Sequence, residues 1–228
     1  MIVSINQPSY LPWLGYFDRI NRSDIHIVLD HVQFEKNSII NRNKIRTQNS
    51  WSWLTVPLKT KSKYGNLDIR NIEIQNTLQW KKKHWKTIQS NYSKCEYFKD
   101  YAPFFQKVYT TEWVKLIDFI NFINKHFLKV LGIKTKIISS YELNPKKAKS
   151  DLILELCQKV DAHEYISGPF GRDYLDLQSF KNAGISVHFH DYSHPVYAQK
   201  FKGFESNMSI IDLLLNHGKD SLKILKNE

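Results

Sequence analysis

The chain has 228 residues, of which 42% are hydrophobic and 24% are charged, and its formal net charge is +11. This composition excludes a disordered or fibrous protein and predicts one globular domain over residues 1–228. No apolar run approaches the ~18 residues that cross a bilayer, and Pro8 interrupts the short apolar start, which argues against a signal peptide. Cys95 and Cys157 lie far apart without CxxC spacing. We therefore expect a soluble, cytoplasmic protein in a reducing compartment.

Lysine supplies most of the positive charge. Basic proteins attract phosphates in general, whether these belong to a polymer, a membrane surface or a nucleotide. Solvated helix faces explain a good share of these lysines, and a phosphate-bearing small substrate would explain the rest as well as RNA would. Because the chain shows no recognised nucleic-acid-binding motif, we expect no nucleic-acid partner.

Residues 1–22 organise the chain. An apolar strand over residues 2–5 runs into Asn6 and Gln7, a turn with two prolines follows, and an aromatic helix begins at residue 13. A strand with a polar tip and a stiff turn is how open α/β sheets build a crevice at their carboxyl edge. An amide such as Gln7 is suited to reading a ligand there, although a tight turn with aromatic packing is the competing interpretation. The candidate substrate-binding residues of this stretch are Gln7, Tyr10, Gly15 and Tyr16.

Residues 24–34 predict a second strand that ends at Asp30. A carboxylate at a strand end faces the crevice of an α/β sheet, so Asp30 is a candidate catalytic acid, and capping of the next turn is its alternative role. Asn41, Arg42 and Asn43 follow, between apolar residues. The planar fork of Arg42 suits a carboxylate or phosphate, and a structural ion pair explains it equally well.

The middle of the chain alternates between strands and helices. Residues 51–56 and 67–75 predict strands, with an exposed basic loop over 59–66. Helices are predicted over 78–93, 98–109 and 113–131, the last ending at Gly132, and together they form a helical insertion near residues 78–131. His84 lies on a Trp/Ile face of the first of these helices. It is a candidate general base, although a packed core histidine is the more common outcome.

The α/β rhythm resumes with a strand at 136–139, a helix at 150–160 and a strand at 164–167. The turn from Ser167 to Arg172, ahead of a short helix at 173–175, resembles an anion cradle and is predicted to bind a diphosphate. An ordinary strand–helix connection is the alternative. The candidate binding residues of this turn are Ser167, Gly168, Arg172 and Tyr174.

Residues 185–190 predict the last strand. His188 and His190 would share one of its faces, but strand alternation produces such pairs freely and no further ligand stands at metal-binding spacing, so we predict no metal site. His194 follows in a loop and ranks first as general base, with Tyr197 and Gln199 as binding residues. A closing helix is predicted over 209–216, with a stop at Gly218.

Several motifs in this order resemble the WbqC-like protein family. They are Gln7-Pro8-x-x-x-Pro12-Trp13-x-Gly15-Tyr16-Phe17, Asp30-x-Val32-Gln33-Phe34, Asn41-Arg42-Asn43, Trp53-Leu54-Thr55-Val56-Pro57, Tyr165-x-Ser167-Gly168, Tyr197-x-Gln199 and Ser209-Ile210-Ile211-Asp212-Leu213. Asn6 and His31 depart from the family pattern, so no catalytic role is placed on either. Members are typically encoded among genes for O-antigen and other surface polysaccharides, which implies a role in making a modified sugar at the nucleotide-sugar stage.

We therefore expect an α/β protein with a mostly parallel, Rossmann-like sheet. The first functional hypothesis is transfer of an acyl or aminoacyl group to the amine of a nucleotide-linked amino sugar, without a cofactor, and with an acyl-donor or carrier protein as a second candidate partner. His194 or His84, with Asp30, would supply the general base. A non-catalytic binding module for a glycan precursor or a biosynthetic partner, and a nucleotidyltransferase-like enzyme, are the alternatives. We further expect Gln7, Tyr16, Asn41 and Arg42 to line one pocket.

Overall fold

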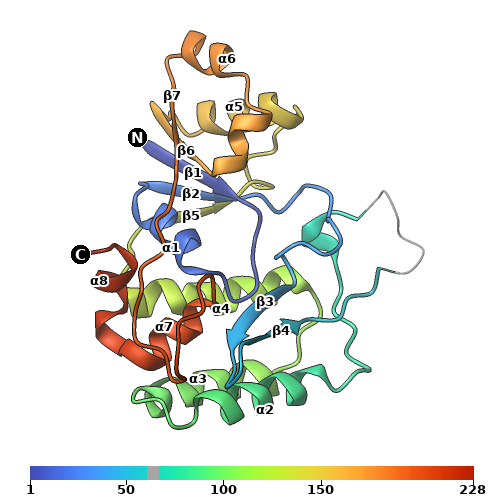
Figure 1. Cartoon of the computed structure of the whole chain (residues 1–228). Coiled ribbons are helices and arrows are strands. Elements are labelled where there is room, and N and C mark those ends of the chain that lie inside the picture. The colour runs from blue at the N-terminus through green and yellow to red at the C-terminus, as the bar shows by residue number, and fades with distance from the viewer. Residues whose placement is uncertain (61–66) are drawn as a thin grey trace.

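A five-stranded parallel sheet is the centre of the structure, a computed structural model that describes residues 1–60 and 67–228 (Figure 1). The strands lie in the order β5-β2-β1-β6-β7, and every neighbouring pair is parallel. In chain order this is third, second, first, fourth and fifth, which follows the strand order of a Rossmann-like sheet. The predicted α/β fold is therefore confirmed. The strands are β1 (Ile2–Asn6), β2 (Ile25–Val28), β5 (Lys136–Ser139), β6 (Glu164–Ser167) and β7 (Ser186–Phe189).

The two faces of the sheet differ in chemistry. Val3 and Ile27 point to one face and pack with Leu156 of α5 (Lys149–Gln158) and Phe180 of α6 (Leu177–Asn182). Alternation along β1 and β2 turns Ser4 and His26 to the other face, and both are fully buried. The sheet is thus apolar under α5 and α6 and polar where it meets α1 (Leu14–Asn21).

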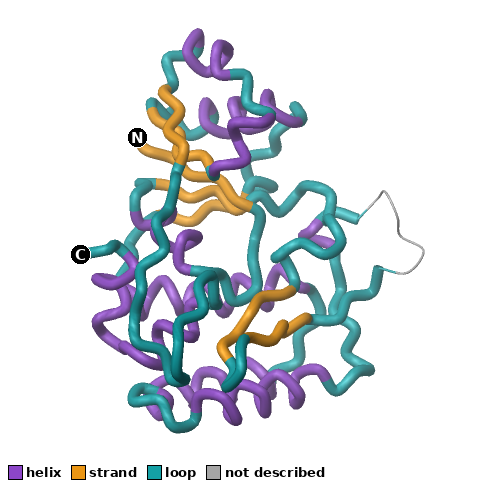
Figure 2. The backbone as a smooth tube through the Cα atoms, in the orientation of Figure 1, coloured by secondary structure: helices purple, strands orange, loops and turns teal. Residues whose placement is uncertain are grey.

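The larger core lies below the sheet as drawn in Figure 1, where helices gather around a two-stranded antiparallel hairpin. Apolar residues at helical spacing, such as Phe119, Ile120, Ile123 and Phe127, bury one face of each helix. Figure 2 shows how much of this half consists of loops running between the helices. Its elements are β3 (Arg42–Arg46), β4 (Trp51–Thr55), α2 (Trp80–Tyr92), α3 (Phe98–Thr110), α4 (Leu116–Leu131), α7 (Ile210–His217) and α8 (Ser221–Leu225), with 3-10 turns η1 (Ile69–Asn71) and η3 (Gly218–Asp220).

Most predicted elements appear near their expected bounds, and Gly132 closes α4 in the left-handed conformation at φ 73°. The strand predicted over 67–75 is wrong. The apolar steps there are Leu67, Ile69, Ile72 and Ile74, and the three-residue step in the middle breaks the alternation, so η1 forms and single bridges flank it. Hairpin strand β3 was not predicted. Only Asn43 and Ile45 form the alternating buried face of its Arg-Asn-Lys-Ile-Arg sequence, and one of these two residues is polar.

Three smaller corrections concern ends of elements. The second strand stops at Val28, two residues before Asp30. The short helix expected at 173–175 is instead the 3-10 turn η2 (Pro169–Asp173). His190 follows β7 and is not in the strand, so it does not extend a strand face with His188. Most of the basic loop predicted over 59–66 lies outside the described residues. Within the described parts, no helix combines the length and apolar character that crossing a membrane requires.

A buried carboxylate ties several of these elements together. Asp212 of α7 is fully buried, and Tyr92 of α2 donates to its Oδ1 at 3.0 Å. Tyr197 and Gln199 both donate to its Oδ2 at 2.9 Å. Burial raises the pKa of Asp212, and the hydrogen bonds from these donors oppose that rise. The network therefore fastens α7 to α2 and to the loop around residue 197.

We predict that Asp212→Ala lowers the free energy of unfolding by about 3 kcal/mol or more, because it leaves the buried hydroxyls of Tyr92 and Tyr197 without their acceptor. Urea unfolding followed by circular dichroism measures the change. Asp220→Ala, at an exposed carboxylate nearby, is the control and should stay within about 0.5 kcal/mol of wild type. Equal stability of the two variants would contradict the role given to Asp212.

Candidate functional site

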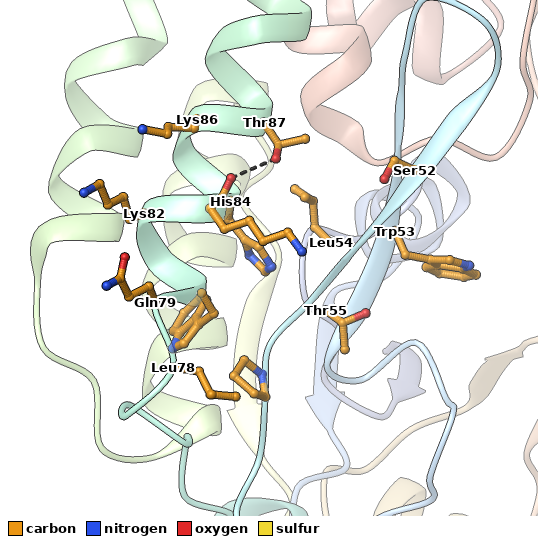
Figure 3. A pocket seen from close by; sticks show the side chains of 13 residues that line it. Ser52, Trp53, Leu54, Thr55, Leu78, Gln79, Lys82, His84, Lys86 and Thr87 are labelled. Atoms are coloured by element: carbon orange, nitrogen blue, oxygen red, sulfur yellow. Dashed lines mark hydrogen bonds between the residues drawn. The ribbon is translucent and has the colours of Figure 1, made fainter.

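The largest hollow described runs between β4 and α2 and has a volume of about 870 Å³ (Figure 3). We call it the lysine groove. Ser52, Trp53 and Thr55 line it from β4, and Lys82, Lys83, His84, Lys86 and Thr87 line it from α2. Trp80, His84 and Ile88 are buried at steps of four residues, so the core face of α2 is fixed and its lysines flank it.

The charges of the lysine groove are unusual for a helix start. Helix α2 has no acidic residue in its first turn, where the dipole favours negative charge, and it begins Trp80-Lys81-Lys82-Lys83. Lys81 pairs with Glu112 at 2.5 Å. Lys82, Lys83 and Lys86 are exposed and form no ion pair in the part of the chain that the structure describes. An anion in the groove would offset the repulsion between these lysines and with the helix dipole.

His84 lies at the floor of the lysine groove and is 4% exposed. Its Nδ1 lies 3.0 Å from the hydroxyl of Tyr10, which lies 2.6 Å from the hydroxyl of Tyr109. The ring also makes a hydrogen bond to the backbone of Thr55. A carbonyl only accepts, so the nitrogen facing Thr55 carries the proton and Nδ1 accepts from Tyr10. Both ring nitrogens are therefore already engaged by the protein.

Burial lowers the pKa of His84 to about 4, with a smaller opposing effect from the Thr55 hydrogen bond. The imidazole is therefore neutral at pH 7. This keeps it from adding to the positive charge of the groove, and it also makes His84 a weak base. Tyr10, predicted to touch substrate, is fully buried, and its hydroxyl contacts His84 instead.

His194 has the opposite arrangement. Its Nδ1 donates to the carbonyl of Pro195 at 2.9 Å, and its Nε2 is buried without a hydrogen-bond partner among the described residues. Burial lowers its pKa, so the ring is neutral with a free lone pair. It packs against Tyr197 and Phe204 and does not line the lysine groove. Tyr197 and Gln199, the predicted binding residues beside it, are hydrogen-bonded to Asp212.

Asp30 lies just beyond β2 and is 5% exposed. Its carboxylate accepts from Ser139 Oγ at 2.7 Å, Ser140 Oγ at 3.0 Å and the amide of Tyr141 at 3.2 Å. These bonds join the carboxyl ends of β2 and β5, so they link two strands that are distant in the sequence and do not form the local cap expected for the next turn. No hydrogen bond or ion pair described for Asp30 involves His84 or His194, so the structure does not assemble the predicted pair.

The residues of the triplet at 41–43 mainly hold the hairpin. Asn43 donates to the carbonyl of Leu11 at 2.7 Å, and Asn41 donates to that of Val56 at 2.8 Å. Arg42 donates to the carbonyl of Asn37 and lies 4.5 Å from the ring centre of Trp53. Arg42 remains partly exposed in a hollow of about 260 Å³, where it could still meet an anion.

The four residues expected in one pocket are not together. Tyr16 and Asp30 line a cavity of about 550 Å³ between α4 and the sheet, while Asn41 and Arg42 line the separate hollow beside Val56. Gln7 is partly buried and lines neither. The reason is that α1 packs its aromatic face inward, which leaves Tyr16 only 4% exposed against His26. Gly15 lies under the indole of Trp13, and a Cβ there would fall 2.3 Å from the ring.

The turn after β6 is already charge-balanced. Arg172 makes two hydrogen bonds to Asp191, at 3.0 and 2.6 Å, and stacks over Phe189. Ser167 is buried and donates to the carbonyl of Gly168, while Tyr174 is exposed. To hold a diphosphate, Arg172 would have to release Asp191.

His190 binds Asp18 at 2.7 Å and His188 lies 3.8 Å from Glu164, and the described residues contain no cluster of three metal ligands.

Two features of the structure were not predicted as candidate sites. The lysines at the start of α2 were not singled out from the chain's other lysines, although a run of cations at a helix N-terminus was a usable signal. Asp18 and Arg19 of α1 are both buried, at 1% and 8% exposure. No periodic pattern indicated this, because they lie next to each other on a helix that the fold encloses.

Comparison with known proteins supports a family assignment. The model of a family described as the WbqC-like protein family matches residues 7–224. The uncharacterized protein Rv1507c of Mycobacterium tuberculosis is 35% identical over 227 residues, which span 98% of this chain and 97% of that protein. No solved structure matches the chain.

The two buried histidines should make stability fall in acid. Burial lowers the pKa of His84 to about 4 and that of His26 to about 3, whereas an unfolded histidine titrates near 6.5. Below pH 6.5 the unfolded chain therefore binds protons that the folded chain does not, so unfolding becomes easier as pH falls toward 4. At pH 5 we expect each histidine to lower the free energy of unfolding by about 2 kcal/mol relative to neutral pH.

Urea unfolding at pH 7.5, 6 and 5 measures this effect. His84→Gln should reduce the slope of the unfolding free energy against pH by up to about 1.4 kcal/mol per unit, whatever its effect at neutral pH. His163→Gln, at an exposed position, is the matched control. A slope that is unchanged in His84→Gln would show that the ring is protonated in the folded protein.

Proposed function

The chain belongs to the WbqC-like protein family, and we propose that it is an enzyme of surface-polysaccharide biosynthesis that transfers an acyl or aminoacyl group to the amine of a nucleotide-linked amino sugar. The observation that carries this proposal is the lysine groove, with three unpaired lysines, a tryptophan and a neutral histidine around about 870 Å³. This volume falls in the range of small-molecule sites.

The groove supplies a complementary group for each part of such a substrate. Lys82, Lys83 and Lys86 would meet the diphosphate, where charge-assisted hydrogen bonds are strongest. Trp53, 36% exposed, also lines the groove, but its indole points away from α2 (Figure 3) and Arg42 lies 4.5 Å from its ring centre, so it would meet only a part of the substrate that reaches past β4. Ser52 and Thr87 add hydroxyls for sugar oxygens. A phosphate-bearing substrate is also one of the explanations that the net charge of the chain left open.

In the proposed reaction the amine nitrogen attacks the carbonyl carbon of the donor. A C–N bond forms, the bond from that carbon to the leaving group breaks, and the proton lost by nitrogen passes to a base. His84 lies in the groove and would accept this proton at Nδ1 after releasing the Tyr10 hydroxyl. His194 has a free lone pair at Nε2, but it does not line the groove. The amine of the sugar would therefore have to extend beyond the groove to reach it. The groove position favours His84, and the free nitrogen favours His194.

The engaged nitrogens of His84 also favour a second candidate function, a binding module that holds a nucleotide-linked glycan precursor without changing it. Both functions use the same groove. They differ in whether a product forms when donor and acceptor are supplied together.

Binding at the groove is tested by calorimetry with UDP, GDP and dTDP in turn. We predict that Lys83→Ala weakens binding of the accepted nucleotide by about 1–3 kcal/mol, the scale of one lost charge-assisted hydrogen bond. Lys223→Ala, an exposed lysine on α8, is the control and should bind as wild type does. If none of the three diphosphates binds wild type, the groove is not a nucleotide site.

Catalysis is tested by mass spectrometry of reactions that contain nucleotide-linked amino sugars and activated acyl or aminoacyl donors. Loss of a true general base should lower kcat by about a hundredfold or more, with the fold intact by circular dichroism. We therefore compare His84→Ala and His194→Ala, and expect one of them to show this loss. Near-wild-type rates in both would exclude a histidine base. Binding without any product would favour the binding module.

A further inference from the structure

A buried arginine lies beside the point where the sheet reverses its strand order. The strands that follow β1 extend first through β2 and β5 to one side, and then through β6 and β7 to the other. In open α/β sheets the ligand crevice lies outside the carboxyl ends of the strands at this point. Gly168 follows β6 there, and Arg19 of α1 reaches it, with only 8% of the arginine exposed.

Arg19 has no acidic partner. Its side chain makes no ion pair or hydrogen bond among the described residues, and its Nε is buried without a partner. The nearby carboxylates form their ion pairs elsewhere, because Oδ2 of Asp18 holds Arg22 and His190, and Asp191 holds Arg172. Oδ1 of Asp18 is buried without a hydrogen-bond partner among the described residues, and Asp18 forms no ion pair with Arg19 there. Burial is the main influence on the pKa of Arg19, and the groups that oppose it are the phenols of Tyr165, Tyr16 and Tyr174, with no carboxylate among them.

A buried guanidinium without a counter-charge opposes folding, since arginine stays protonated and its desolvation is not repaid. Burial does lower the pKa of Arg19, but from so high a value that the charge remains. Folding alone therefore does not explain why a cation occupies this position. A ligand that carries the missing negative charge does.

The surroundings make room for both the guanidinium and a ligand. A Cβ on Gly168 would lie 2.5 Å from Nη1 of Arg19, although φ at this glycine is an ordinary −69°. The glycine is thus required for space, so that the guanidinium can lie against the backbone. A cavity of about 360 Å³ opens beside it, and its lining residues are Trp13, Gly15, Arg19, Pro169, His190, Asp191, Tyr192 and Ser193.

We propose that Arg19 anchors an oxyanion site in this cavity, which binds the carboxylate or phosphate of a small ligand. The free edge of a guanidinium accepts two oxygens of such a group side by side. His190, Ser193 and Asp191 are the further polar groups of the lining, and Arg172 neutralises the carboxylate of Asp191. The rings of Trp13 and Tyr192 would contact the ligand's carbon skeleton. This cavity shares no lining residue with the lysine groove, so the inference goes beyond the proposed function and does not rest on it.

The test is thermal unfolding in sodium phosphate, sodium acetate and sodium chloride at equal ionic strength. A ligand that binds only the folded state raises the Tm with its concentration. We expect phosphate or acetate to raise the Tm of wild type above its value in chloride, and the more effective ion identifies the group that the site prefers. Arg19→Met should reduce this difference to what the lysine groove alone contributes, and the double variant Arg19→Met/Lys83→Ala should lose the groove's contribution as well. In chloride Arg19→Met should unfold at the wild-type Tm or above it, because it removes an unpaired buried charge.

Three further variants make the result decisive. Gly168→Ala keeps the arginine but displaces its guanidinium, and should reduce the ion-specific shift in the same way. Arg70→Met, at a partly exposed arginine stacked on Tyr141, should keep it. Lys83→Ala should keep the part of it that Arg19 contributes, which separates this site from the lysine groove. The proposal is overturned if wild type has the same Tm in all three salts, or if the shift is undiminished in Arg19→Met or, should that variant not fold, in Gly168→Ala.

Discussion

The structure depends on a buried connection, residues 8–12, between β1 and α1. All five residues are buried, and a buried loop is tolerated only when its backbone groups find partners. Elements from distant parts of the chain supply them, so this connection fixes their positions as well as its own. Figure 1 shows it descending from β1 toward α4 before the chain returns as α1. The bonds are Asn124 to the carbonyl of Ser9, Tyr10 N to the carbonyl of Ile40, Asn43 to the carbonyl of Leu11 and Ile210 N to the carbonyl of Pro12.

The same connection joins the sheet to the lysine groove. Tyr10 leaves the buried loop and its hydroxyl meets His84, which in turn meets the backbone of β4. Leu11 adopts φ 47°, a conformation that a branched residue rarely occupies, and the bond from Asn43 to its carbonyl helps to hold it. The orientation of the imidazole at the groove floor is therefore set by a turn next to the first strand. A change in that turn would reach the groove without touching any ligand.

The sequence was sufficient for the fold because its signals were local. Apolar alternation in β1, helical spacing in α4 and the stop at Gly132 each depend on neighbours in the chain. The candidate site was harder, because the roles of its polar residues depend on distant partners. Asp30, Arg172 and Gln199 each have the chemistry of a binding residue, yet each is engaged by a partner far from it in the sequence. Conversely, Arg19 was inconspicuous until the fold showed that nothing neutralises it.

The polar residues therefore fall into two groups, according to whether other groups of the protein supply their hydrogen-bond or ion-pair partners. Asp212, Asp30 and Asn43 are buried with full sets of partners, which is what a structural role requires. The lysines of α2 and the guanidinium of Arg19 are cations that folding physics disfavours where they lie, one by repulsion at a helix start and the other by burial without a counter-charge. A bound anion would offset both of these unfavourable electrostatic terms. Since folded proteins depart from local rules mainly where function requires it, these two places are where the ligands of this protein are to be sought.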